Sequence, residues 1–391
     1  MYLIYRSKAL NFLLILFLFL GLVFIQSSCK GSSKDKTETK KDEIQTIRKI
    51  YPVVRYSLFS PVYTIDKEYK SMKGPYSVQN IYLENSDDVQ LLWIVGMASE
   101  IVSEDGQKVL SDEYMCHANI DIDSPSQRFM FRNQKRGSYN RLVTLSQGQT
   151  DVKLPEGYGI PVLSSTPLEL TTQVLNLNSR EKLPIKVRQR VTVKYIRNKD
   201  LEEPLIPLYR QDGAYVMVSM EGQPAVFDLN EPLPEHQGAS CLPGQNAGTD
   251  IYEDRLGRLF SGHWVVKPGR VENHTVVTEK MNLPYDTETH AIGVHLHPFA
   301  EYIALKDLTT NEVLYENRPV QAEGRIGLAQ VPYYSDGDKG IPLYKDHEYE
   351  IISTYNNTSS EDQDAMAVLG LYSIDKDFNP LPELLKNVEE K

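Results

Sequence analysis

Two histidines separated by a single residue are the feature of this sequence that most directly suggests metal chemistry. They are His295 and His297, within the segment Ile292–Pro298. If this segment is a β-strand, both imidazoles lie on one face, roughly 6.6 Å apart along the strand, and the apolar residues between them face a core. Two imidazoles on one face can share a metal ion. The alternative is a pair of histidines that decorates an exposed strand.

A methionine in a later apolar segment could complete such a site. Met366 lies in Asp364–Tyr372, which also has the pattern of a strand. If the two strands are sheet neighbours, the thioether lies beside the imidazoles. Imidazole suits copper and thioether sulfur favours Cu(I), so a His, His, Met set would select copper over magnesium or calcium. A methionine in an apolar strand is otherwise a core residue.

Four segments in this part of the chain resemble a known family. Their order is Gly262–Gly269 (GHWVVKPG), His295-Leu296-His297, Tyr355–Thr358 and Asp364-Ala365-Met366. They resemble the C-terminal lobe of the copper type II, ascorbate-dependent monooxygenases, which include the peptidylglycine α-hydroxylating and dopamine β-monooxygenases. Weaker similarity through Leu154–Pro161 and Gln173-Val174-Leu175 extends the resemblance over most of the chain, from about residue 75 onward.

The resemblance implies a fold, a cofactor and an activity. Each lobe of that family is a jelly-roll β-sandwich, and the C-terminal lobe holds the oxygen-activating copper. By resemblance, His295, His297 and Met366 are the ligands of one copper ion. The implied activity is hydroxylation of a small-molecule or peptide substrate that the sequence does not identify, with electrons from ascorbate or another external reductant.

The first lobe departs from the family pattern. Where the family binds a second, electron-transfer copper through three histidines, this chain has Cys116-His117 and then Leu175. By strand alternation, Cys116 and His117 should face apart, as a core thiol beside a surface histidine. His117 is therefore only a weak additional metal candidate.

Three further histidines precede the His295 strand, namely His263, His274 and His290. We expect structural or surface roles for them, and only His263, beside Trp264 in a family-like segment, is kept as a weak metal candidate.

The positions with which amidating family members bind a peptide are also different. Those members carry arginine, asparagine and tyrosine where this chain has Gly293, Val368 and Gly370. A buried carboxylate would lack its bidentate partner, so peptide amidation is not expected.

The N-terminus has the layout of an export signal. Basic residues Arg6 and Lys8 precede an apolar run from Leu10 to Ile25, and small residues lead to Cys29. This run is shorter than the roughly 18 to 20 residues of a membrane-spanning helix. We predict a lipoprotein-type signal peptide at 1–28, a lipid anchor on Cys29 and a bacterial envelope location, periplasmic or at the outer surface. Residues 29–50 are polar and predict a flexible tether.

Composition excludes two classes of protein. The formal net charge of −11 makes nucleic acid an unlikely partner. Only three cysteines occur, so the fold does not rest on a disulfide framework. A Cys116–Cys241 disulfide is permitted outside the cytoplasm, but the sequence does not require it.

The rest of the chain predicts an all-β fold. Short alternating segments are separated by Gly, Pro, Asn and Asp, and no long segment has helical periodicity. We expect two tandem antiparallel jelly-roll-type β-sandwich lobes, at 51–210 and 211–385, with the candidate copper site in the second. The predicted strands are Val89–Ile101, Tyr114–Ile122, Leu168–Leu177, Pro184–Ile196, Ala291–Asp307, Glu348–Tyr355 and Ala365–Ile374.

Three functions therefore stay open. The chain is a copper-dependent monooxygenase, a copper-binding protein without oxygenase activity, or a metal-free β-sandwich interaction module. The usual hydrolase and phosphate-binding motifs are not found in the sequence.

Overall fold

The computed structural model describes residues 51–84, 88–122, 141–178, 182–211, 213–221 and 251–385. The predicted signal peptide, the tether and Cys241 lie outside these residues, so the anchor on Cys29 and the Cys116–Cys241 disulfide stay predictions. Within the described ranges, no helix is both long enough and apolar enough to cross a membrane.

Strands make up nearly all the regular structure of the described residues, which confirms the all-β fold class. The described helical segments are short: 3₁₀ turns at Asp112–Tyr114 and Asn198–Asp200, and the helices α2 (Thr278–Met281) and α3 (Pro382–Leu385). The strands are β1 (Val54–Phe59), β2 (Tyr63–Ile65), β3 (Tyr76–Ile81), β4 (Leu91–Ser103), β5 (Met115–Ile122), β6 (Arg141–Ser146), β7 (Asp151–Lys153), β8 (Tyr158–Leu163), β9 (Leu168–Val174), β10 (Ile185–Arg197), β11 (Ile206–Gln211), β12 (Val218–Ser219), β13 (Ile251–Glu253), β14 (Leu259–Ser261), β15 (Trp264–Val266), β16 (Gly269–Val276), β17 (Thr287–Leu296), β18 (Ala300–Asp307), β19 (Glu312–Asn317), β20 (Val320–Gln321), β21 (Leu328–Gln330), β22 (Tyr334–Ser335), β23 (Ile341–Leu343), β24 (Tyr349–Asn357), β25 (Gln363–Ala365) and β26 (Ala367–Ile374).

Strand β10 illustrates why these sequences form strands. Its apolar residues alternate with Lys, Arg and Thr, and Val187, Val191 and Val193 are all fully buried. Each buried valine stabilises the fold by about 1.5–3 kcal/mol relative to an exposed one. The prediction for this strand, Pro184–Ile196, is correct to within one residue at each end.

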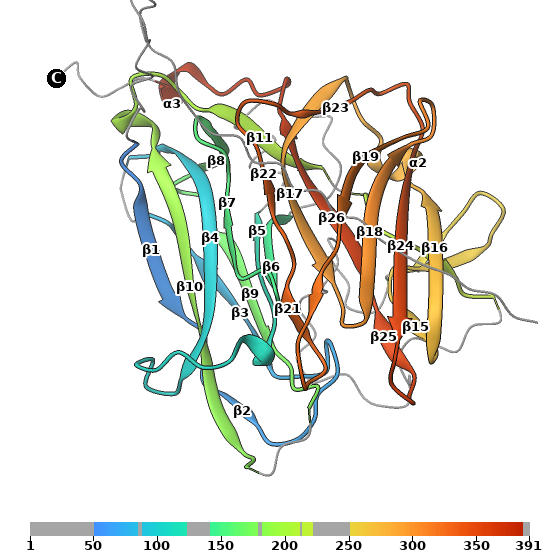
Figure 1. Cartoon of the computed structure of the whole chain (residues 1–391). Coiled ribbons are helices and arrows are strands. Elements are labelled where there is room, and N and C mark those ends of the chain that lie inside the picture. Colours follow the sequence, from blue (N-terminus) through green and yellow to red (C-terminus); the bar gives the residue numbers. More distant parts are fainter. Residues whose placement is uncertain are drawn as a thin grey trace, which may run out of the picture. The chain divides into compact units, whose positions relative to one another are not determined.

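The first sandwich packs two sheets around one apolar core. One sheet has the strand order β1-β10-β4-β8, and the other has the order β3-β9-β5-β6. Side chains from both sheets meet in this core, and they include Met97, Ile120 and Val191. In Figure 1 these strands are blue to green.

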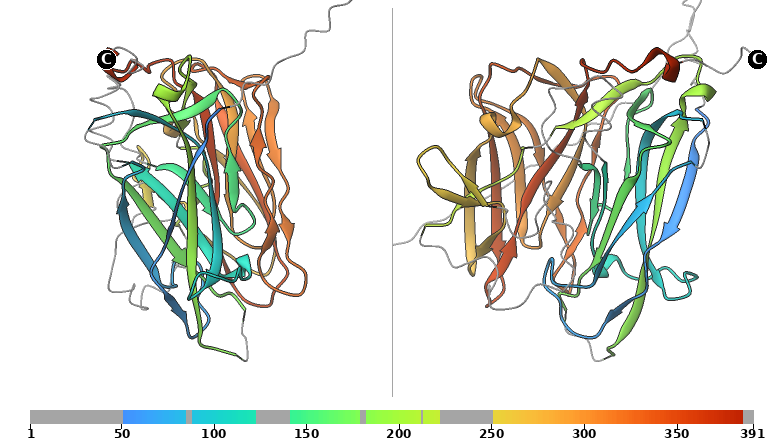
Figure 2. Two further views of the ribbon diagram at one scale, coloured as in Figure 1. Left: turned by 90° about the vertical axis from the view of Figure 1, so that its left-hand side faces the viewer. Right: turned by 180° about the vertical axis from the view of Figure 1, so that it is seen from behind.

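The second sandwich is built in the same way from later strands. Strands β26 and β17, with β22 and β23 beside β17, form one layer, and β16-β24-β18-β19 form the other. Their shared core includes Ile292, Leu305 and Ile351. Figures 1 and 2 show these orange and red strands next to the green strands of the first sandwich.

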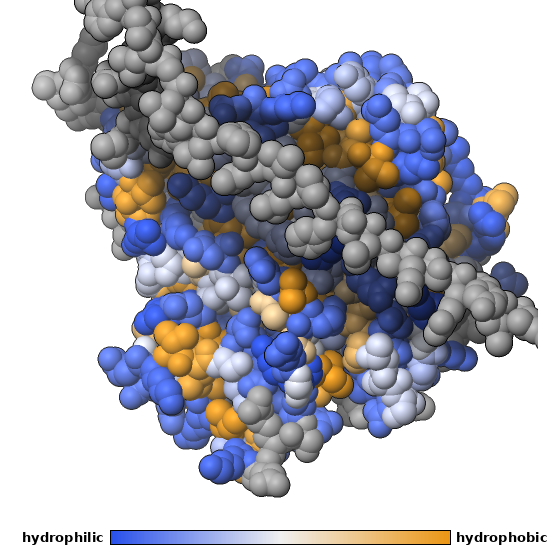
Figure 3. Space-filling model, in the orientation of Figure 1, coloured by the Kyte–Doolittle hydropathy of each residue, from blue (hydrophilic) through white to orange (hydrophobic). Residues whose placement is uncertain are grey.

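Strand β11 joins the two sandwiches. It pairs in parallel with β8 and antiparallel with β26, so one 11-stranded sheet runs through both. The proposed boundary at residue 210 falls within this strand. On the face seen in Figure 3, hydrophobic residues occur in small groups among hydrophilic ones, because most large apolar side chains are in the cores.

Two predicted strands are interrupted, and both breaks lie at candidate ligands. The segment Ala291–Asp307 is two strands, β17 and β18, because Pro298 has no backbone N–H and Phe299 has a φ of 70°. The segment Ala365–Ile374 is broken at Met366, where the chain passes from β25 to β26. The prediction of single continuous strands here is wrong.

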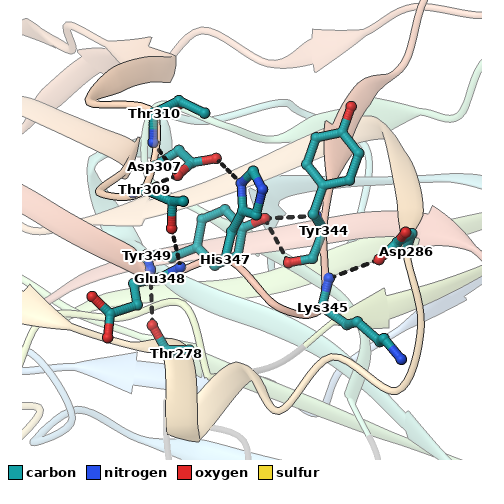
Figure 4. A network of polar contacts seen from close by, with 10 residues as sticks. All are labelled: Thr278, Asp286, Asp307, Thr309, Thr310, Tyr344, Lys345, His347, Glu348 and Tyr349. Carbon is teal, nitrogen blue, oxygen red and sulfur yellow. Dashed lines mark hydrogen bonds and ion pairs between the residues drawn. The ribbon is translucent and has the colours of Figure 1, made fainter.

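A polar network fixes the loops at one end of the second sandwich (Figure 4). Asp307 is 2% exposed and accepts hydrogen bonds from the backbone N–H groups of Thr309 and Thr310. One of its oxygens also lies 2.7 Å from Nδ1 of His347. Burial opposes the charged form, but these partners outweigh it and lower the pKa of Asp307.

We expect the Asp307 network to stabilise the fold in a pH-dependent way. Because the folded-state pKa is lowered, the contribution is present above the ordinary pKa of aspartate, roughly 3.9, and is lost as the pH falls through the folded value. Asp307→Asn should cost about 1.5–3 kcal/mol at pH 7 and progressively less below about pH 4. Urea unfolding at several pH values tests this. Asp286→Asn, in the same network but exposed, is the control, and a pH-independent cost would contradict the prediction.

Candidate metal centre

The pairing of β17 with β26 brings the predicted ligand segments together. In the antiparallel register, His295 is opposite Val368 and Leu296 is opposite Ala367. Directly opposite residues point to the same face of a sheet. Continuing this register by one residue places His297 opposite Met366. The strand of the two histidines and the strand that follows Met366 are therefore sheet neighbours, as the sequence alone left open.

The histidine face of this strand pair is covered by the first sandwich. The Val294 N–H donates to Gln149 Oε1 at 3.0 Å, and Ser71 Oγ lies 3.3 Å from His297 Nε2. As a result, His295 is 8% exposed and His297 is 3% exposed. The alternative of an exposed, decorative pair of histidines is wrong, because this polar face of the strand is buried between the two sandwiches.

A third imidazole lies beside this pair. The ring of His297 is 5.3 Å from that of His295 and 5.4 Å from that of His263, measured between centroids. His263 directly precedes β15, is buried, and was a weak candidate from the sequence. One possible ligand atom from each of His263, His297 and Asp364 lies within 4.8 Å of the others.

Asp364 orients His297. Its carboxylate lies 2.9 Å from His297 Nδ1, and the side chains of His297 and Asp364 are 4% and 12% exposed. Burial opposes the charge of each, but their mutual attraction outweighs it, raising the pKa of His297 and lowering that of Asp364. Carboxylates commonly hold metal-binding histidines by one ring nitrogen in this way. The Nε2 atom is then the one available to a metal.

His295 is a buried imidazole without a partner. Neither ring nitrogen has a hydrogen-bond partner among the described residues. Burial, reinforced by the nearby imidazoles of His297, His117 and His263, holds the pKa of His295 well below its usual range. It is therefore neutral at pH 7, which is the form that binds metals. An unsatisfied buried polar group costs about 1–3 kcal/mol, and a bound metal would remove that cost.

Tyr355, on the facing sheet of the second sandwich, connects the backbones of two candidate ligands. Its hydroxyl accepts from the His297 N–H at 3.2 Å and donates to the Met366 carbonyl at 2.5 Å. Burial is the main cause that raises the pKa of Tyr355, so the hydroxyl keeps its proton. Tyr355 thus holds His297 and Met366 together just beyond the last ladder pair.

The predicted arrangement of Cys116 and His117 is wrong. The pairing of β5 with β9 shifts register between Met115 and His117, so Cys116 is an extra residue in a bulge, which interrupts strand alternation. Its Sγ lies 3.3 Å from Nδ1 of His117. Both residues are buried, so His117 is not a surface histidine. Met366, Leu175 and Cys116 belong to one buried cluster.

The remaining sequence candidates lie elsewhere. His274 is exposed on β16 between Glu272 and Glu350. His290 stacks on Tyr158 at a centroid distance of 4.4 Å. Neither residue belongs to the group of interacting imidazoles.

Sequence reasoning gave no role to Ser71, Tyr355 or Asp364. Tyr355 and Asp364 lie in the segments that resemble the copper family, and Asp364 precedes Met366 by two residues. This two-residue spacing from Met366 was the sequence feature that could have identified Asp364. Ser71 lies in a loop far away in the sequence, and no sequence pattern pointed to it.

The donor set fits copper. Imidazole nitrogens with a thioether, beside a thiol, are borderline and soft ligands, which bind copper well and bind magnesium or calcium poorly. His295, His297 and Met366 would hold the ion, and Asp364 would orient His297 from outside the ligand set.

Comparison with known proteins adds little. No family model and no curated protein matches the chain. Among solved structures, a recombinant peptide:N-glycanase F has a TM-score of 0.35 at 9% identity and covers 84% of this chain and 97% of its own. The PBCV-1 VP54 protein, fitted into a reconstruction of the virophage Sputnik, has a TM-score of 0.30 at 8% identity and covers 85% and 97%. Similarities this distant assign no function to the chain.

We expect Tyr355→Phe to weaken metal binding more than its effect on folding would suggest. The change leaves the His297 N–H and the Met366 carbonyl without their partner, which costs about 1–3 kcal/mol of stability. It should also lower Cu(I) affinity about 10- to 100-fold, as loss of an outer-shell partner does. Competition with a Cu(I) chelator measures the affinity.

Tyr349→Phe is the matched control for this experiment. Tyr349 is equally buried on the same strand, and its hydroxyl bridges the N–H and carbonyl of Tyr344, away from the site. It should lose similar stability and keep the parent's copper affinity. An equal loss of affinity in both variants would show that Tyr355 acts only through folding.

Proposed function

We propose that this chain is a copper-binding protein of the bacterial cell envelope that holds one copper ion with His295, His297 and Met366. The observation that carries the proposal is His295, an imidazole that is buried and has no hydrogen-bond partner for either ring nitrogen among the described residues. A neutral imidazole kept in this state, beside a second imidazole and a thioether, is the arrangement that a soft metal stabilises.

The burial of the site favours Cu(I). His297 is 3% exposed and Met366 is fully buried, so a metal there is largely shielded from water. Thioether sulfur prefers Cu(I), and a protected site suits holding or delivering that ion. The envelope location and the lipid anchor on Cys29 belong to the same proposal and rest on the sequence of residues 1–29.

Oxygenase activity is a second candidate, and one observation favours it. The register of β17 and β26 places the strand of the HxH pair beside the strand that follows Met366, as the resemblance to copper monooxygenases would require. Bound copper would supply one-electron chemistry with dioxygen. The chain's own residues would keep His295 neutral, orient His297 through Asp364, and restrict access of water. Electrons would come from ascorbate or another external reductant.

The copper proposal predicts one equivalent of Cu(I) per chain. His295→Gln and Met366→Leu each remove one ligand at nearly constant volume, and each should lose stoichiometric binding. His274→Gln and Met281→Leu are matched controls, because His274 is exposed and Met281 is buried in the core of the second sandwich. Anaerobic Cu(I) titration with elemental analysis measures the result. A parent chain that binds no copper would leave the metal-free interaction module as the better hypothesis.

The oxygenase candidate predicts ascorbate-dependent oxygen uptake by the copper-loaded chain. Uptake should vanish in Met366→Leu, persist in Met281→Leu, and exceed that of the same amount of free copper with chelator. Tight Cu(I) binding without any oxygen uptake would leave the copper-binding function alone.

A further inference from the structure

The bulged cysteine of the first sandwich lies against the histidine pair of the second. We propose that the Cys116 thiolate is a fourth ligand of the copper ion, so that the metal joins the two sandwiches. This inference rests on the proposed function and extends its ligand set to the other half of the chain.

One hydroxyl touches both Cys116 and His297. Ser71 Oγ lies 3.9 Å from Cys116 Sγ and 3.3 Å from His297 Nε2. Because Asp364 occupies Nδ1 of His297, Nε2 is the atom left for a metal. The sulfur of Cys116 therefore lies one small side chain away from the atom that would face the ion.

The two sulfur residues also pack in one cluster. Cys116 and Met366 are both buried and belong, with Leu175 and Val368, to one cluster. Val368 lies opposite His295 in the β17–β26 ladder, so the cluster and the imidazoles share one face of that ladder. A thiolate together with a thioether is a softer donor set than the thioether alone and selects Cu(I) more strongly.

An independent observation points to a ligand at this place. His295 is more than nine-tenths buried, and its ring nitrogens have no hydrogen-bond partner among the described residues. It lies close enough to His117, the neighbour of Cys116, to interact with it electrostatically. The unpartnered imidazole of one sandwich and the thiol of the other thus lie in the same buried layer.

The bulge in β5 aims the thiol into this layer. In a regular strand, residue 116 would point away from His117, but the extra residue lets both lie together. On metal binding the Sγ–H bond of Cys116 breaks, and the sulfur electron pair forms the bond to copper. Nδ1 of His117, 3.3 Å from Sγ, is in position to accept the proton. No oxidation state changes in this step.

The test uses the full chain loaded with Cu(I) under anaerobic conditions. Cys116→Ser and Cys116→Ala should each bind Cu(I) at least about 10- to 100-fold more weakly than the parent, because a direct ligand matters no less than an outer-shell partner. X-ray absorption at the copper edge should count two sulfur neighbours in the parent and one in Cys116→Ser. Cys241→Ser is the control and should resemble the parent.

A second measurement uses only the parent protein. Copper loading of the parent should protect Cys116, but not Cys241, from alkylation, as mass spectrometry of peptides would show. Unchanged affinity and sulfur count in Cys116→Ser would overturn this inference and leave the proposed function intact. A Cys116–Cys241 disulfide in the isolated protein would overturn it as well. If the parent binds no Cu(I), the proposed function itself fails.

Discussion

The register of the β17–β26 ladder is the constraint on which the rest of the site depends. Because strand side chains alternate, one face of this ladder must supply the core of the second sandwich, and the other face then carries His295 and, by continued alternation, His297. A shift of one residue would exchange the faces and place the imidazoles in the apolar core. Burial of Ile292, Val294 and Leu296 therefore fixes the chemistry of the opposite face.

The layer between the two sandwiches contains many polar groups beside the apolar cluster of Cys116, Leu175, Met366 and Val368. Side-chain amides there hydrogen-bond to backbone groups of the other half, as Gln147 does to the Leu328 N–H and Asn178 does to Ile326. Such bonds hold the halves in one relative position, since their geometry is directional. Within this layer neither ring nitrogen of His295 has a hydrogen-bond partner among the described residues, and a buried group of this kind calls for an explanation, of which a bound ion is one.

The copper hypothesis and the geometry support each other through different residues. The resemblance identifies His295, His297 and Met366 as candidate ligands. The structure adds Asp364, which pairs with the side chain of His297, and Tyr355, which accepts a hydrogen bond from the backbone N–H of His297. The resemblance also expected a degenerate site in the first sandwich. In the structure, Cys116 and His117 lie in the same buried layer as the candidate ligands of the second sandwich, and not in a separate site.

The sequence by itself determined the all-β fold, most strand positions and the direction in which the histidines face, because alternation is a local property with a period of two. It misplaced Cys116, because a one-residue bulge depends on the partner strand β9 and not on β5 alone. It could not tell that the histidine face is buried, since the covering groups, Ser71 and Gln149, come from distant loops. Only the tertiary structure decided which separate segments share one layer, because side chains far apart in the chain meet there only when both sandwiches have formed.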